Sequence, residues 1–160
     1  MIDARVLEHA DLLRGVSPEQ VQEVVALAAE FSFREGEHFL RQGDPADTLF
    51  IIETGRVELT TGLNVFGVMK EVALEELIAG KTLGWSAMVE PYTLTLNARA
   101  VTATSLVGFR RVALHKLFAE RTQIGFLIIN NLLSEVGRRL GVTKALWLRE
   151  LQRSVNAKYR

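Results

Sequence analysis

The sequence predicts a mainly β fold with flanking α-helices: a roll of short strands between N-terminal helices and one long C-terminal helix. Between residues 31 and 109, short segments are apolar or alternate between apolar and polar residues, as half-buried strands do. Turn signals separate these segments about every 8–12 residues, which is typical of a roll, barrel or sandwich. On both sides of this region the apolar residues recur at helical spacing. The turn signals are Gly36, Gly43-Asp44-Pro45, Gly55, Gly62, Gly80 and Gly84.

The N-terminal helix with the clearest signals begins after Ser17. We expect Ser17 to cap it, Pro18 to occupy its first position, and Gln20 to complete a capping box. Another short helix is expected over residues 4–13, ending before Gly15. The apolar residues at helical spacing after the cap are Val21, Val24, Val25 and Ala28.

The C-terminal region is predicted to hold a short helix over residues 112–120 and a long helix from a cap at Thr122 to about residue 155. A helix of about 34 residues is about 50 Å long, which exceeds what a small roll can cover. We therefore expect a homodimer through this helix; the alternative is that it folds back at Gly137 or Gly141. Its apolar seam, in steps of three or four, comprises Phe126, Ile129, Leu133, Val136, Leu140, Thr143, Trp147, Leu151 and Val155.

Composition narrows the classes of function. The 160 residues include 19 basic and 19 acidic side chains, so the basic excess typical of nucleic acid-binding domains is missing. The absence of cysteine excludes disulfides, thiolate metal sites and cysteine nucleophiles. The N-terminus lacks the apolar core of a signal peptide, and no uncharged apolar run reaches about 18 residues. We predict a cytoplasmic protein without a membrane segment.

Catalytic and metal-binding patterns are missing from the sequence. The histidines His9, His38 and His115 are far apart and have no metal-ligand spacing. No serine-nucleophile motif or phosphate-binding loop is present, so we predict a protein that is not an enzyme and binds no metal. Two charged groups are expected to be solvated: the acidic residues Glu71, Glu75 and Glu76, and the pair Arg138-Arg139.

Four segments in one order resemble a known family. Residues 33–59, FREGEHFLRQGDPADTLFIIETGRVEL, resemble the first half of the cyclic nucleotide-binding domain shared by catabolite-activator-type regulators and kinase regulatory subunits. Residues 74–88, 98–118 and 138–147 resemble its phosphate-binding cassette, its closing strands and helix, and its long helix. The resemblance implies a double-stranded β-helix, or jelly roll, over residues 1–121 with its N-terminal helices and short closing helix. Residues 122–160 would form the long dimerisation helix of the same domain.

The cassette of that family follows the pattern F-G-E-x-A-L and, several residues later, R-[ST]-A. Its backbone N–H groups and arginine hold the cyclic phosphate, and its glutamate binds the ribose. The resemblance places Gly84 at the start of the cassette here, Trp85 at the glutamate position and Leu94 at the arginine position. The ligand-binding residues that it implies are Gly84, Trp85, Ser86, Ala87, Leu94, Thr95 and, on the long helix, Thr143.

Both charged ligand contacts of the family are therefore replaced by apolar side chains. Their loss would weaken binding of cAMP or cGMP on the order of 10³-fold. We predict a regulatory domain that senses a small molecule, either a cyclic nucleotide bound weakly or a different ligand, and transmits its binding through the C-terminal helix. The alternative is a degenerate domain that binds no nucleotide and acts as a dimerisation or protein-interaction module.

The expected partner is a second copy of the chain, with a partner protein as the second kind of partner. The family's DNA-binding helix-turn-helix follows the long helix, and the chain ends at Arg160, so no DNA-binding element is expected. The predicted dimer-interface residues are Leu133, Val136, Leu140, Trp147 and Leu151.

Overall fold

The computed structural model describes residue 2 and residues 4–159. Three short helices open the chain: α1 (Ala4–Glu8), the 3-10 helix η1 (Asp11–Leu13) and α2 (Pro18–Val25). The predicted capping box of α2 is confirmed, because Ser17 Oγ accepts from the backbone N–H of Gln20 at 3.3 Å and Gln20 Oε1 accepts from that of Ser17 at 3.2 Å. The prediction that Ala28 continues this helix is wrong: α2 ends at Val25, and Ala28 pairs with Phe109 in a sheet.

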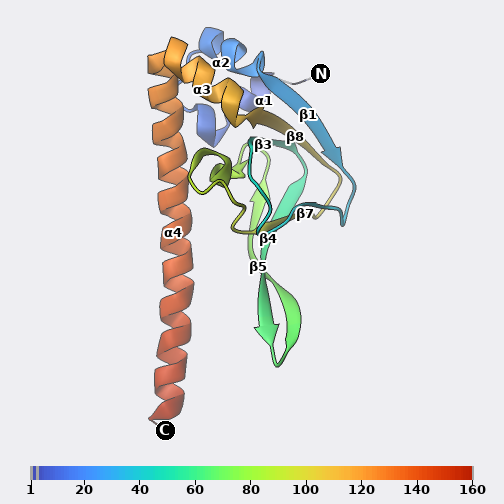
Figure 1. Ribbon diagram of the computed structural model, residues 1–160, viewed down its shortest axis with the longest axis vertical. Helices are drawn as coiled ribbons and strands as arrows, with labels where there is room; N and C mark the ends of the chain where they lie inside the picture. The colour runs from blue at the N-terminus through green and yellow to red at the C-terminus, as the bar shows by residue number, and fades with distance from the viewer. Residues whose placement is uncertain (1, 3, 160) are drawn as a thin grey trace.

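The strands that follow form two four-stranded antiparallel sheets, in the orders β1-β8-β3-β6 and β2-β7-β4-β5. The predicted fold class, a mainly β jelly roll with helices at both ends, is confirmed (Figure 1). The strands are β1 (Ala28–Phe33), β2 (His38–Leu40), β3 (Thr48–Thr54), β4 (Arg56–Val65), β5 (Val68–Ile78), β6 (Thr82–Leu83), β7 (Asn97–Ala100) and β8 (Thr104–Arg110).

The prediction of a turn at Gly62 is wrong. Gly62 lies within β4 and pairs with Glu71 of β5, and the chain reverses instead at Phe66-Gly67, where both residues have a positive φ. A two-residue loop with two positive φ values matches the right-handed twist of a hairpin. The β4–β5 hairpin is consequently long, and it extends beyond the rest of the roll (Figure 1).

The central strands β3 and β8 of the first sheet are buried on both sides, whereas β1 is partly exposed. Side chains of a strand point alternately to its two sides. Leu49 and Ile51 of β3 pack among the helices, whereas Phe50 and Ile52 pack between the two sheets. The helices thus form an outer layer over the roll, and Leu59 lies on the facing side of the second sheet, in the core between the sheets.

Two further helices complete the chain, α3 (Arg111–Glu120) and α4 (Thr122–Lys158). The predicted cap at Thr122 is wrong, since Thr122 is the first helical residue and Arg121 precedes it without a side-chain cap. The alternative in which the long helix folds back is also wrong, because α4 is continuous through both of its central glycines. Asn131 fixes α4 to the N-terminal segment by donating to the carbonyl oxygens of Leu12 at 2.9 Å and Arg14 at 2.8 Å.

Beyond this attachment α4 runs alongside the roll and continues past it (Figure 1). With 37 residues it is about 55 Å long. Within the part of the chain that the structure describes, no helix combines the length and the apolar character needed to cross a membrane.

Gly55 closes the turn between β3 and β4 at a point of close backbone approach. Its φ is +90°, and a Cβ atom there would lie 2.5 Å from the carbonyl oxygen of Ala103 and 2.5 Å from Thr104 Oγ1. Gly36 has a similar φ of +82°, but a Cβ atom there would meet nothing within 4 Å. A side chain at Gly36 would therefore cost backbone strain alone, whereas a side chain at Gly55 would cost backbone strain and a steric clash.

We expect Gly55→Ala to lower the free energy of unfolding by roughly 1–3 kcal/mol more than Gly36→Ala, because only the first substitution adds overpacking to the backbone strain. Urea unfolding followed by circular dichroism measures both variants. Equal losses would contradict the close approach at Gly55.

Candidate functional site

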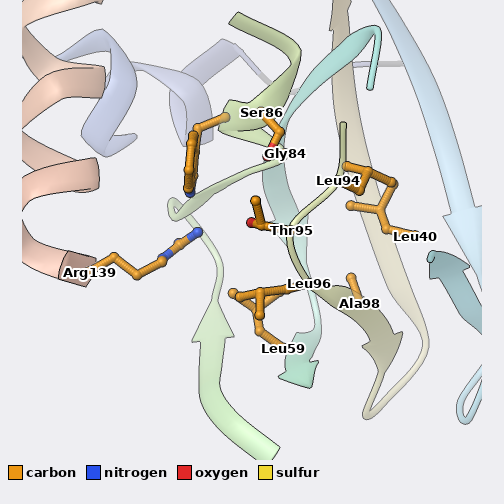
Figure 2. A pocket seen from close by; sticks show the side chains of 10 residues that line it. Leu40, Leu59, Gly84, Ser86, Leu94, Thr95, Leu96, Ala98 and Arg139 are labelled. Atoms are coloured by element: carbon orange, nitrogen blue, oxygen red, sulfur yellow. The ribbon is translucent and has the colours of Figure 1, made fainter. Parts of the chain in front are cut away.

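A small cavity lies between the second sheet, the segment after β6 and the middle of α4 (Figure 2). Its position corresponds to the predicted ligand site. Five of the predicted residues line it, together with side chains that the sequence analysis did not identify. The lining residues are Leu40, Leu59, Gly84, Trp85, Ser86, Leu94, Thr95, Leu96, Ala98 and Arg139.

Apolar side chains fill most of this cavity. Ala98 of β7 pairs with Leu40 on one neighbouring strand and Leu59 on the other, so these three residues form a continuous floor. The free volume of the cavity is only about 20 Å³. That is about the space that one water molecule requires, whereas pockets for drug-sized ligands usually measure about 300–1,000 Å³.

The turn of the cassette is formed by Gly84 and the 3-10 helix η2 (Trp85–Met88). Gly84 has a φ of +76°, and a Cβ atom there would lie 2.9 Å from the carbonyl oxygen of Thr48, so glycine is required on both grounds. Ser86 is buried in this turn, and Trp85 is half-buried against the core formed by the helices.

Leu94, which the resemblance places at the arginine position of the cassette, is a core residue. Its side chain is buried in a small cluster with Ala46 and Ala87. Its backbone is fixed on both sides, because its N–H donates to the carbonyl oxygen of Asp44 at 2.8 Å and its carbonyl oxygen accepts from Gly43 at 2.8 Å. Ala87, also predicted to bind the ligand, lies in this cluster and is not among the residues that line the cavity.

Arg111 holds the cassette against the rest of the roll. Its Nη1 donates to the carbonyl oxygens of Ala46 at 3.1 Å and Ala87 at 3.2 Å, and its guanidinium lies 3.8 Å from the centre of the Tyr92 ring. A cation at the first position of a helix is unfavourable to the helix dipole. The contacts of Arg111 with the cassette offset this cost and fix the position of η2.

The expectation that Arg139 is solvated is wrong. Arg139 extends from α4 toward the loop that carries Thr95 and Leu96 (Figure 2), and only 11% of its side chain is exposed. Its Nη2 donates to the carbonyl oxygen of Thr82 at 3.3 Å, and its Nε lies 3.3 Å from Glu75 Oε2. Burial lowers the pKa of the guanidinium, and the charge of Glu75 partly opposes this shift.

The expectation that Glu75 is solvated is wrong as well, since only 19% of its side chain is exposed. Its carboxylate pairs with Arg139 and also with Arg138, whose Nη1 lies 2.8 Å from Glu75 Oε1. Helical phase could have identified Arg139, because it follows the buried Ile128 and Leu132 on the same face of α4. Two adjacent arginines are typical of a solvated helix face, so the residue types alone predicted exposure.

Thr143 is not among the residues that line the cavity. It lines a neighbouring, mostly apolar groove between the β4–β5 hairpin and α4, which we call the α4 groove. The corresponding free volume here is about 420 Å³, and Leu96 and Arg139 belong to both the groove and the cavity. The α4 groove is lined by Leu63, Leu74, Glu75, Leu96, Arg139, Val142, Thr143, Leu146, Trp147 and Glu150.

The predicted dimer-interface residues form a second feature of α4, which we call the α4 seam: Leu133, Val136, Leu140, Trp147 and Leu151. At about 100° per residue they fall within an arc of about 60°, roughly a quarter turn from the face that lines the groove. Leu140 is 67% exposed, and Trp147, which also lines the groove, is 61% exposed. Leu133 and Leu151 are exposed as well and Val136 is half-buried, so most of the seam is uncovered within one copy of the chain.

Comparison with known proteins finds a family model and relatives that include a regulatory protein. The family model "Cyclic nucleotide-binding domain" matches residues 30–121. A CRP-like cAMP-activated global transcriptional regulator of Mycobacterium tuberculosis is 25% identical over 84% of the chain and 57% of its own length. Glutaminase 1 of Bradyrhizobium diazoefficiens is 32% identical over 52% of the chain, but this match spans only 13% of the glutaminase.

Among solved structures, a cyclic nucleotide-binding domain from Methylobacillus flagellatus superposes with a TM-score of 0.78. The match covers 92% of the chain and 81% of that protein, at 20% identity, so it supports the fold alone. The chain therefore spans a small part of a longer relative such as the glutaminase and little more than half of the transcriptional regulator.

Proposed function

Because the chain belongs to the cyclic nucleotide-binding domain family, we propose that it is a dimeric regulatory domain that senses a small molecule other than a tightly bound cyclic nucleotide. One observation carries this proposal: α4 itself supplies a wall of the cavity through Arg139. A ligand in the cavity would therefore contact the helix that pairs with a second copy, and its binding would bias the position of that helix.

The residues of the cavity do not fit a cyclic nucleotide. Leu94 and Trp85 stand where the family has the arginine and glutamate that pair with the phosphate and the ribose, and the leucine floor fills the space that a nucleoside requires. An unpaired phosphate next to Leu94 would lose its solvation without a compensating charge there. Thr95 and Ser86 offer neutral hydroxyl groups only.

The second copy in the proposed dimer covers the α4 seam. Apolar residues at heptad-like spacing favour lengthwise helix pairing, and α4 extends well beyond the part of the roll that it touches (Figure 1). Because the seam lies a quarter turn from the groove, pairing along it leaves the α4 groove beside the dimer contact. Output through α4 would then be a change in the alignment of the two helices.

A second candidate function is a dimerisation or docking module that binds no small molecule. The small free volume of the cavity, about 20 Å³, favours it, because a cavity closed by leucines needs no ligand for stability. The two candidates share the dimer and differ in whether any ligand enters the cavity.

For cyclic nucleotides, we expect no saturable response to cAMP or cGMP up to about 1 mM, because two charge-assisted contacts are missing. Tryptophan fluorescence of Trp147→Phe, in which Trp85 is the remaining tryptophan, reports on the cavity wall. Thermal unfolding of the unmodified chain provides the parallel measurement. Saturation at micromolar nucleotide in either measurement would contradict this part of the proposal.

For the dimer, we expect the unmodified chain to sediment as a dimer and Leu140→Asp to sediment as a monomer, because the substitution buries a charge in the seam. Ala145→Asp is the matched control: it adds the same charge to α4, about 140° around the helix from Leu140. A monomeric unmodified chain, or equal effects of the two substitutions, would overturn the dimer.

A further inference from the structure

Arg139 is a buried cation whose hydrogen-bonding capacity is incompletely used. A guanidinium has several N–H donors in a planar fork, but the contacts of Arg139 are the 3.3 Å hydrogen bond to Thr82 and the 3.3 Å ion pair with Glu75. Its Nε has no hydrogen-bond partner, since Glu75 is within ion-pair distance but poorly aligned. Burying a cation is unfavourable unless anionic groups and hydrogen bonds compensate for its lost hydration, and here the compensation is partial.

A second unpaired polar atom belongs to a residue that contacts Arg139. Thr82 is 2% exposed, and its Oγ1 has no partner either. In the described part of the chain, Thr82 Oγ1 and Arg139 Nε are the buried side-chain nitrogen and oxygen atoms without a hydrogen-bond partner. Buried polar atoms are normally paired, and a place where they are not is a place for bound water or an ion.

The neighbouring carboxylates compensate the charge of Arg138 better than they compensate the charge of Arg139. Arg138 lies 2.8 Å from Glu75 and 3.2 Å from Glu135, whereas the ion pair of Arg139 within the described residues is the longer contact with Glu75, at 3.3 Å. An anion that approached Arg139 from the cavity would therefore find a guanidinium with free donor capacity. Glu75 would keep its shorter contact with Arg138.

The surroundings of Arg139 also define the rest of a ligand. Among the described residues, one cation and the hydroxyl-bearing Ser86 and Thr95 line the cavity, and its other side chains are apolar. The α4 groove, which shares Arg139 and Leu96 with the cavity, is mostly apolar as well, with Glu75 and Glu150 as its acidic residues. A ligand with one negative charge and an apolar body matches Arg139 and these apolar walls, because a second negative charge would be buried without a cationic partner.

We propose that Arg139 binds the anionic group of a small monoanionic ligand with an apolar body, such as a carboxylate on a short alkyl chain. The carboxylate lies in the cavity between the Arg139 guanidinium and Thr95, and the alkyl chain lies in the α4 groove, whose free volume is about 420 Å³. The charge that the family's cassette supplies is thereby provided by α4. This inference rests on the proposed function, since it places the ligand in the same cavity.

The test is a calorimetric titration of the full chain with hexanoate, with inorganic phosphate as the anion that lacks an apolar body. We expect saturable binding of hexanoate to the unmodified chain and to the control Arg149→Gln, which replaces an exposed arginine of α4 that lines neither the cavity nor the α4 groove. Arg139→Gln should weaken binding by roughly 10- to 100-fold, as loss of a charge-assisted contact does. Thr95→Val should weaken it by a smaller factor and keeps the proposal testable if Arg139→Gln fails to fold.

Absence of hexanoate binding, or equal binding by Arg139→Gln and the unmodified chain, would overturn the inference. Binding of phosphate in preference to hexanoate would contradict the claim that the ligand has an apolar body. Sedimentation of the same samples separates this inference from the proposed function: a dimer that binds no hexanoate contradicts the inference alone, whereas a monomer contradicts the proposed function.

Discussion

The guanidinium of Arg139, held between the roll and α4, is the interaction on which the arrangement of the site depends. It brings together α4, Glu75 of β5 and Thr82 of β6, which are distant in the sequence. A buried cation is tolerated only where its partners stay in position, because breaking such a contact leaves an uncompensated charge. The position of the middle of α4 and the shape of the cavity are consequently set by the same group.

This arrangement differs from the family's pattern in where the charge lies. In the pattern the arginine belongs to the cassette, whereas Leu94, which the resemblance places at that position, packs with Ala46 and Ala87. The cassette has become part of the apolar core, fixed by Arg111 through the carbonyl oxygens of Ala46 and Ala87. Among the described residues, the cation that lines the cavity is Arg139, which comes from the helix that we propose as the dimer contact. The helix would therefore contact the ligand directly.

Much of the fold could be predicted because its signals are local. Ser17 and Gln20 specify the start of α2 within four residues, and Gly55 specifies a corner that other residues cannot adopt without strain. The errors arose where tertiary contacts override local signals. Ala28 continues a helical pattern but pairs with β8, and Gly62 resembles a turn residue but is held within β4 by its pairing with β5.

The sequence predicted which segments form the candidate site, but it did not predict the buried cation or the free volume of the cavity. Gly84, Trp85, Ser86, Leu94 and Thr95, for which the resemblance implies ligand binding, line one cavity, and their binding to a ligand stays a prediction. The burial of Arg139 depends on contacts with Thr82 and Glu75. Thr82 is 57 positions away in the sequence and Glu75 is farther, and no local pattern specifies such contacts. The free volume of the cavity likewise depends on how Leu40 and Leu59 meet across β7.

The most direct measurement is a crystal structure of the unmodified chain with hexanoate. The account predicts that the carboxylate lies within hydrogen-bond distance of the Arg139 guanidinium, with the alkyl chain in the α4 groove and Glu75 retained by Arg138. A closed cavity in which Arg139 keeps its contact with Glu75, while hexanoate is absent or bound elsewhere, would contradict it.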